Sequence, residues 1–115
     1  MADIKLIDKS ISLDHLKQVA AQGFGDMVKA VVDIDKMIMA IGGDLHADEE
    51  AFLLDHGSKQ ESLWGINIYV NEPRESWIEF DSMINIRPSQ NNRSRNVEDE
   101  ATRQKIIQVV NSLIA

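Results

Sequence analysis

Two stretches of alternating apolar and polar residues, 63–70 and 77–87, most strongly limit the folds open to this chain. In the first stretch every second residue from Trp64 to Val70 is apolar. In the second, the apolar residues of one face are Ile78, Phe80, Ile84 and Ile86. A period of two is that of a β-strand with one buried face. The polar segment between the stretches contains Pro73, which a central strand excludes, so the pattern predicts a hairpin.

Single helices separate the other predicted strands. Residues 4–7 are expected to form a short strand, and the segments 27–33 and 37–41 a second hairpin. Helices are predicted over 13–22 behind an N-capping Ser12, within 44–57, and from Asp99 to about Leu113. The order predicts an α+β domain over residues 1–115, with a mainly antiparallel sheet of four or five strands and about three helices on one face.

Composition narrows the class of protein further. A chain of 115 residues, 43% of them hydrophobic, is typical of one globular domain. The absence of cysteine excludes disulfides and thiolate metal sites. No apolar run reaches the roughly 18 residues of a membrane span, and we expect a cytoplasmic protein without a membrane partner. The net charge of −7 argues against broad, non-specific nucleic-acid binding.

One face of the predicted sheet is polar. Strand parity gives this face Lys29, Asp33, Asn67, Tyr69, Glu79, Asp81, Asn85 and Arg87. Trp77 and Met83 would add apolar walls. A solvated sheet face is the simpler interpretation. The large side chains favour a ligand cleft or an oligomer interface instead.

The last predicted strand continues into "INIRPSQNNRSR", which holds three arginines and no acidic residue. Planar guanidinium groups suit phosphate or carboxylate. The candidate ligand-binding residues are Tyr69, Asn85, Arg87, Asn91, Arg93 and Arg95. The arginines could equally pair with the protein's own acids, such as Glu79, Asp81 or Asp99. No glycine-rich phosphate-loop pattern is present.

The sequence supports catalysis or metal binding less strongly than it supports anion binding. His46 and Glu50 share a helix face, and His46, Glu79 and Asp81 are the candidates for acid–base chemistry. Asp33, Glu79 and Asp81 are the candidates for an oxygen-ligand magnesium site. The chain matches no nuclease or GxSxG hydrolase signature, so the sequence does not assign an enzyme activity or a cofactor.

Three long phrases carry a family resemblance: "VKAVVDI", "GGDLHADEEAFLLDHGSKQESLWGINIY" and "IEFDSMINIRPSQNNRSR". From about Leu13 to Leu113 the chain resembles a family of short bacterial and archaeal proteins of unknown function. The resemblance implies a small, self-contained prokaryotic protein. It implies no activity, cofactor or catalytic residue.

Three hypotheses therefore stand. The first is a binding protein that recognises a nucleotide or another phosphate-bearing ligand through the Arg/Asn loop and the polar sheet face. The second is an interaction module, with a homodimer as its simplest form. The third is a phosphoester hydrolase, in which the arginines hold phosphate. All three place the functional surface on the polar side of the sheet.

Overall fold

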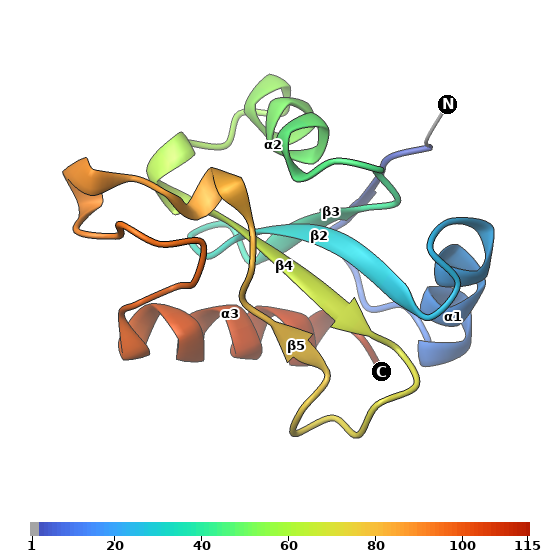
Figure 1. The fold of residues 1–115 in the computed structure, drawn as a ribbon. Coiled ribbons are helices and arrows are strands. Elements are labelled where there is room, and N and C mark those ends of the chain that lie inside the picture. The colour runs from blue at the N-terminus through green and yellow to red at the C-terminus, as the bar shows by residue number, and fades with distance from the viewer. Residues whose placement is uncertain (1–2) are drawn as a thin grey trace.

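A computed structural model describes residues 3–115 as one five-stranded sheet with three α-helices (Figure 1). The strands are β1 (Lys5–Ile7), β2 (Met27–Asp33), β3 (Ile38–Ile41), β4 (Leu63–Tyr69) and β5 (Ile78–Glu79). They lie in the order β1-β3-β2-β4-β5, and every neighbouring pair is antiparallel. The predicted α+β class and the antiparallel sheet are confirmed.

Three α-helices pack on the sheet, and the first and the last begin behind their predicted capping residues. The helices are α1 (Leu13–Gln22), α2 (His46–Asp55) and α3 (Glu100–Leu113). The Ser12 hydroxyl accepts a hydrogen bond from the His15 N–H at 3.0 Å, and the Asp99 carboxylate accepts one from Thr102 N–H at 2.9 Å. Each cap satisfies a backbone donor that the first turn leaves without a partner.

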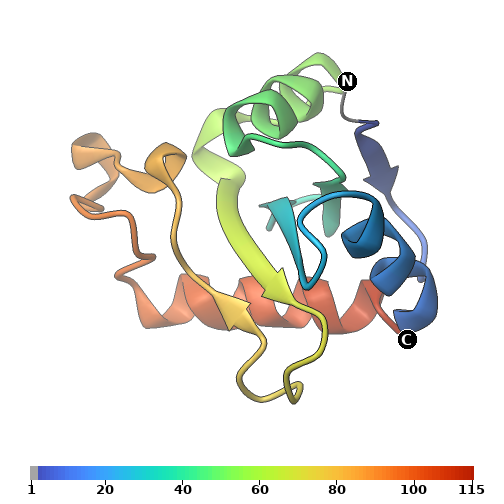
Figure 2. The ribbon, with the colours of Figure 1, turned by 45° about the vertical axis from the view of Figure 1, so that its right-hand side comes forward.

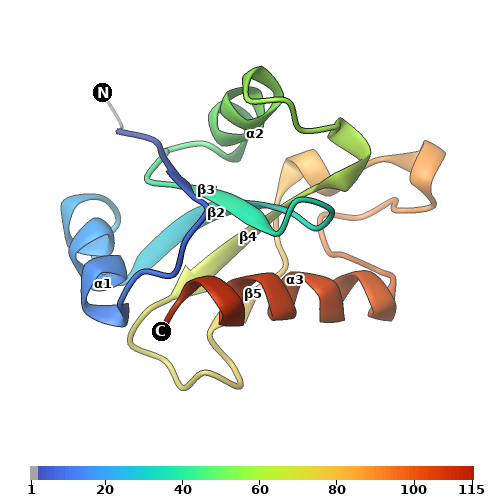
Figure 3. The same ribbon diagram turned by 180° about the vertical axis from the view of Figure 1, so that it is seen from behind.

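The helices cover both faces of the sheet, which corrects the prediction that all three lie on one face. In all three ribbon views α1 and α3 lie on one side and α2 on the other (Figures 1, 2 and 3). The larger core lies beneath α1 and α3, and a smaller one beneath α2 joins Val31, Ala40, Leu53 and Leu63. Consecutive apolar residues make β2 hydrophobic on both faces, and the second apolar patch requires its own helix.

The predicted long strand over 77–87 is also wrong beyond its first residues. Only Ile78 and Glu79 pair with β4. The chain then leaves the sheet through the short 3₁₀ helices η2 (Met83–Asn85) and η3 (Pro88–Gln90); a third, η1 (Gln60–Ser62), precedes β4. Trp77, expected as a wall of the polar face, is buried in the larger core.

Candidate functional site

Three polar residues form a row across the middle of the sheet. The strand registers place Lys29 of β2 opposite Asn67 of β4, and Asn67 opposite Glu79 of β5. Lys29 has the same parity as Val31, which packs beneath α2, so the row lies on the α2 side of the sheet. Beyond the edge of α2, polar side chains occupy this face, and η2 packs against β4 there.

A pocket of about 500 Å³ lies over this row, beside the first turn of α2. We call it the sheet-face pocket. Its polar lining comes from β2, α2, β4, β5 and the segment after β5. These residues are Lys29, His46, Asn67, Tyr69, Glu79, Asp81, Ser82 and Arg95. The structure therefore brings together the predicted residues His46, Tyr69, Glu79, Asp81 and Arg95.

Glu79 organises one wall of the pocket. Its carboxylate accepts hydrogen bonds from the Asn67 amide at 2.9 Å and from the Tyr69 hydroxyl at 3.1 Å. Partial burial and the bond to Glu79 raise the pKa of the Tyr69 hydroxyl, so it stays a donor at neutral pH. The Oδ1 atom of Asn67 is buried without a hydrogen-bond partner among residues 3–115. A buried acceptor of this kind favours a ligand that carries a donor.

Two cations flank the row from either side of β4. The Arg95 guanidinium lies 2.6 Å from the Asp81 carboxylate, and both side chains are partly exposed. Lys29 is half-buried and forms no ion pair with any residue from 3 to 115. Its ammonium therefore remains available to an anion.

His46, the first residue of α2, has one ring nitrogen fixed and the other open. Its Nε2 donates to the Ile66 carbonyl oxygen at 2.8 Å, which makes Nδ1 the acceptor of the neutral ring. Nδ1 has no partner within the described chain and is not among the buried orphan atoms. Burial lowers the pKa of His46, with Lys29 and Arg95 acting in the same direction. His46 is therefore a neutral proton acceptor at pH 7.

The mouth of the pocket is apolar. Leu45 is 59% exposed and Met83 is 66% exposed, and both belong to the lining. Exposed apolar residues beside a polar pocket fit a ligand with a flat or hydrocarbon part, or a partner surface.

The remaining residues of the predicted arginine loop do not line the pocket. Arg87 is 91% buried: it donates to the carbonyl oxygens of Gln60 and Leu63 and stacks over the Trp64 ring at 4.2 Å. Its two terminal NH groups are therefore taken by the protein's own backbone, and its buried Nε has no hydrogen-bond partner among residues 3–115. Arg93 is exposed and contributes no side-chain hydrogen bond within residues 3–115.

The asparagines of the loop hold its shape. Asn85 exchanges two hydrogen bonds with the backbone of Gly65, at 2.8 and 3.0 Å. Asn92 donates to three carbonyl oxygens of the same loop. Asn91 is exposed and adopts the left-handed conformation, with φ of 58°, that ends η3. The loop's polar composition thus serves its fold in large part.

The candidate metal ligands are not brought together. Asp33, at the far end of β2, accepts hydrogen bonds from the backbone of Asp35 and Lys36 and from the Ser58 hydroxyl. It closes the β2–β3 turn rather than facing Glu79. Over residues 3–115 no three histidine or acidic side chains converge in a way that could hold a metal ion.

A buried acid was not predicted as unusual from the sequence. Glu49 is fully buried in α2, and its Oε2 accepts a hydrogen bond from the Gly43 N–H at 2.9 Å. Burial raises the pKa of its carboxyl group to about 9. In the sequence only the double glycine Gly42–Gly43 pointed to this burial. A Cβ at Gly43 would lie 2.8 Å from Glu49 Cγ, so the glycine leaves room for the buried side chain.

These features define an α+β domain with a polar pocket on the open part of one sheet face. The chain belongs to the family described as Protein of unknown function (DUF5674), whose model matches residues 5–113. No curated protein and no solved structure matches the chain. No helix in the described residues is long and apolar enough to cross a membrane.

Proposed function

We propose that the protein binds a small phosphate-bearing ligand in the sheet-face pocket. The observation that carries the proposal is the unpaired ammonium of Lys29, half-buried in a pocket that Arg95 also lines. Arg95 meets the Asp81 carboxylate through its Nε, and its terminal amino groups have no partner among residues 3–115, so they and the Lys29 ammonium can donate to an anion. Of the three arginines of the loop, only Arg95 lines this pocket and contributes to the proposed site.

The unfilled acceptors narrow the ligand class. Asn67 Oδ1 is buried without a donor and His46 Nδ1 is an open acceptor, and a bare phosphate ion supplies donors poorly. Hydroxyl groups of a sugar or nucleoside would supply them. The ligand is therefore a sugar phosphate or nucleotide, of the kind abundant in the cytoplasm where we expect the protein to work.

The test is a calorimetric titration with inorganic phosphate, ribose 5-phosphate and adenosine monophosphate. Lys29→Met removes the charge and keeps most of the length, and we expect at least a tenfold weaker affinity, which is about 1.4 kcal/mol. Lys17→Met changes an exposed lysine of α1 and is the matched control.

Two results would overturn the proposal. One is a parent protein that binds none of the three probes at millimolar concentration. The other is a Lys29→Met variant that binds as tightly as the parent. An affinity lost instead in Arg93→Ala would place the site at the tip of the arginine loop.

A second candidate function, phosphoester hydrolysis, rests on the open Nδ1 of His46. A neutral imidazole next to a bound phosphate can take a proton from an attacking water. Turnover of p-nitrophenyl phosphate by the parent but not by His46→Gln would support it. Equal binding with no turnover would leave the pocket a binding site.

Homodimerisation is the competing use of the same surface. It would bury Leu45 and Met83 at the mouth of the pocket. Sedimentation of the protein with and without ligand separates the two uses, because a dimer closed over the mouth would exclude the ligand.

A further inference from the structure

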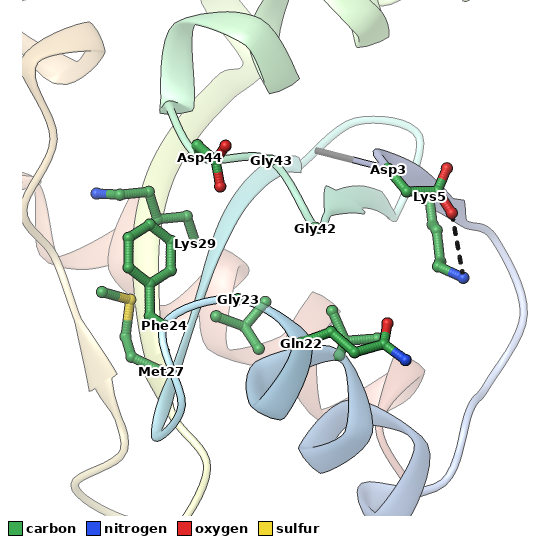
Figure 4. A pocket seen from close by; sticks show the side chains of 12 residues that line it. Asp3, Lys5, Gln22, Gly23, Phe24, Met27, Lys29, Gly42, Gly43 and Asp44 are labelled. Atoms are coloured by element: carbon green, nitrogen blue, oxygen red, sulfur yellow. Dashed lines mark ion pairs between the residues drawn. The ribbon is translucent and has the colours of Figure 1, made fainter. Parts of the chain in front are cut away.

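A second cavity, of about 360 Å³, lies where α1 ends and β2 begins (Figure 4). One side is apolar, with Val19, Phe24, Met27 and Val28 in its lining. Phe24 is 46% exposed. The Phe24 and Met27 side chains lie together on one wall, with Lys29 next to them. We call this space the glycine-walled cavity.

The segment from β3 to α2 forms another wall of the cavity. Its two glycines are required by the close approach of neighbouring protein atoms. Gly42 has φ of 92°, and a Cβ there would lie 2.5 Å from the Asp3 carbonyl oxygen. Gly43 leaves room for the buried Glu49. At these two positions the wall presents backbone to the cavity, which allows close approach of a flat group, and the next residue, Asp44, adds its side chain to the lining.

The glycine-walled cavity and the sheet-face pocket adjoin each other. Lys29 lines both spaces, with its Nζ 5.5 Å from the Phe24 ring centroid. The chain is also continuous between them: residues 42–44 line the cavity, and residues 45–47 line the pocket. The Lys29 ammonium and the start of α2 therefore lie between the sheet-face pocket and a cavity with one apolar wall, whose other lining residues include Asp3, Lys5, Gln22 and Asp44.

The start of α2 adds donors at this junction. Leu45, its N-cap residue, makes no side-chain capping bond. The N–H groups of Asp48 and Glu49 donate to the Leu45 carbonyl oxygen, and those of His46 and Ala47 have no acceptor among residues 3–115. The partial positive charge of a helix start favours an anion there. The buried and unpartnered Asn67 Oδ1 independently indicates a ligand in the adjoining pocket.

We infer that the two spaces hold one elongated ligand, a phosphodiester with its phosphate at Lys29 and the start of α2. The hydroxylated arm lies in the sheet-face pocket against the acceptors of Asn67 and His46. The aromatic or aliphatic arm lies in the glycine-walled cavity against Phe24 and Met27. This inference rests on the proposed function and names its substrate class.

The experiment compares three probes by calorimetry. Thymidine 5′-monophosphate carries the hydroxylated arm, p-nitrophenyl phosphate carries the aromatic arm, and the p-nitrophenyl ester of thymidine 5′-monophosphate carries both. We expect the diester to bind at least tenfold more tightly than either monoester. Phe24→Ala should reduce diester affinity to that of thymidine monophosphate and leave the latter unchanged. Leu54→Ala, an exposed apolar residue outside both spaces, is the matched control.

Amide shifts in NMR spectra locate each arm. The diester should move the Gly42 and Gly43 amides together with those of Asn67 and Tyr69. Thymidine monophosphate should move only the second pair.

Three outcomes separate the hypotheses. A diester that binds no better than thymidine monophosphate, with Phe24→Ala unchanged, overturns the inference. The proposed function survives that result if Lys29→Met still weakens thymidine monophosphate. Simultaneous, non-competing binding of the two monoesters also overturns the inference, because the spaces would then hold separate ligands. Failure of all three probes overturns the inference, and failure of phosphate, ribose 5-phosphate and adenosine monophosphate as well overturns the proposed function.

Discussion

Arg87 shows how a residue that looks functional in the sequence can be structural. A guanidinium in a polar loop suits an anion, but here its two terminal NH groups already bind the carbonyl oxygens of Gln60 and Leu63, and only its buried Nε has no acceptor among residues 3–115. The adjoining Trp64 ring covers its face. Sequence pattern identifies the donor group and not its acceptor, because the acceptors come from a segment more than twenty residues away.

We therefore predict that Arg87→Lys lowers stability rather than affinity. Lysine can neither reach both carbonyl oxygens with a planar fork nor stack in the same way. The free energy of unfolding should fall by about 1–3 kcal/mol, measured by urea denaturation. Arg93→Lys, at an exposed arginine of the same loop, should change it by less than about 0.5 kcal/mol. Loss of phosphate binding in a fully stable Arg87→Lys variant would return Arg87 to the ligand site.

Among the elements, the segment from Ser82 to Glu98 departs furthest from the sequence pattern. Alternation predicted a strand as far as Arg87, and β5 ends at Glu79. The Asn85 side chain supplies the acceptor and donor that the missing strand would have offered to Gly65, and it also donates to the Arg95 carbonyl oxygen at 3.0 Å. An amide can imitate a backbone in this way, so a period of two does not by itself require strand pairing.

Asn85→Asp tests this role with almost no change of shape. The carboxylate can still accept from the Gly65 N–H, but it cannot donate, and it faces two carbonyl oxygens. The buried charge and lost donors should lower the free energy of unfolding by about 2–4 kcal/mol. Hydrogen exchange of the Gly65 amide should accelerate at the same time. The same change at the exposed Asn91 should have little effect, and equal losses at both positions would refute the role of Asn85.

At the scale of the whole molecule, the sequence predicted elements better than it predicted their placement. Local signals gave α1 and β2 their observed bounds, because caps, glycines and strand periods act within a few residues. The position of α2 depends on which face of the sheet remains uncovered, which is a property of all five strands together. The pocket was predictable in part, since strand parity placed Lys29, Asn67 and Glu79 on one face. His46 was among the candidates from the sequence, but the position of the first turn of α2 beside this row could not be predicted.

The placement of α2 over the sheet buries Glu49, and this gives the molecule a pH dependence. In the unfolded chain the carboxyl ionises near its ordinary pKa of 4.5, whereas the folded protein keeps the proton up to about pH 9. The folded state thus binds more protons across that range, and the free energy of unfolding falls as pH rises. His46, with its lowered pKa, acts in the opposite direction only below about pH 6.5. Above that pH, His46 does not oppose the decrease in the free energy of unfolding that Glu49 causes.

We predict that the parent loses about 2 kcal/mol of stability between pH 7 and pH 9, since one proton corresponds to 1.36 kcal/mol per pH unit at most. Glu49→Gln keeps the acceptor for the Gly43 N–H and cannot ionise. Its free energy of unfolding should therefore vary less with pH than that of the parent, and should exceed the parent's value as the pH rises. Urea denaturation at each pH gives both curves, with Glu72→Gln as an exposed control. Parallel curves for the parent and Glu49→Gln would mean that the folded protein holds Glu49 as a carboxylate at neutral pH. Lys29 would then be its counter-ion, and the ammonium on which the anion site depends would already be partly neutralised.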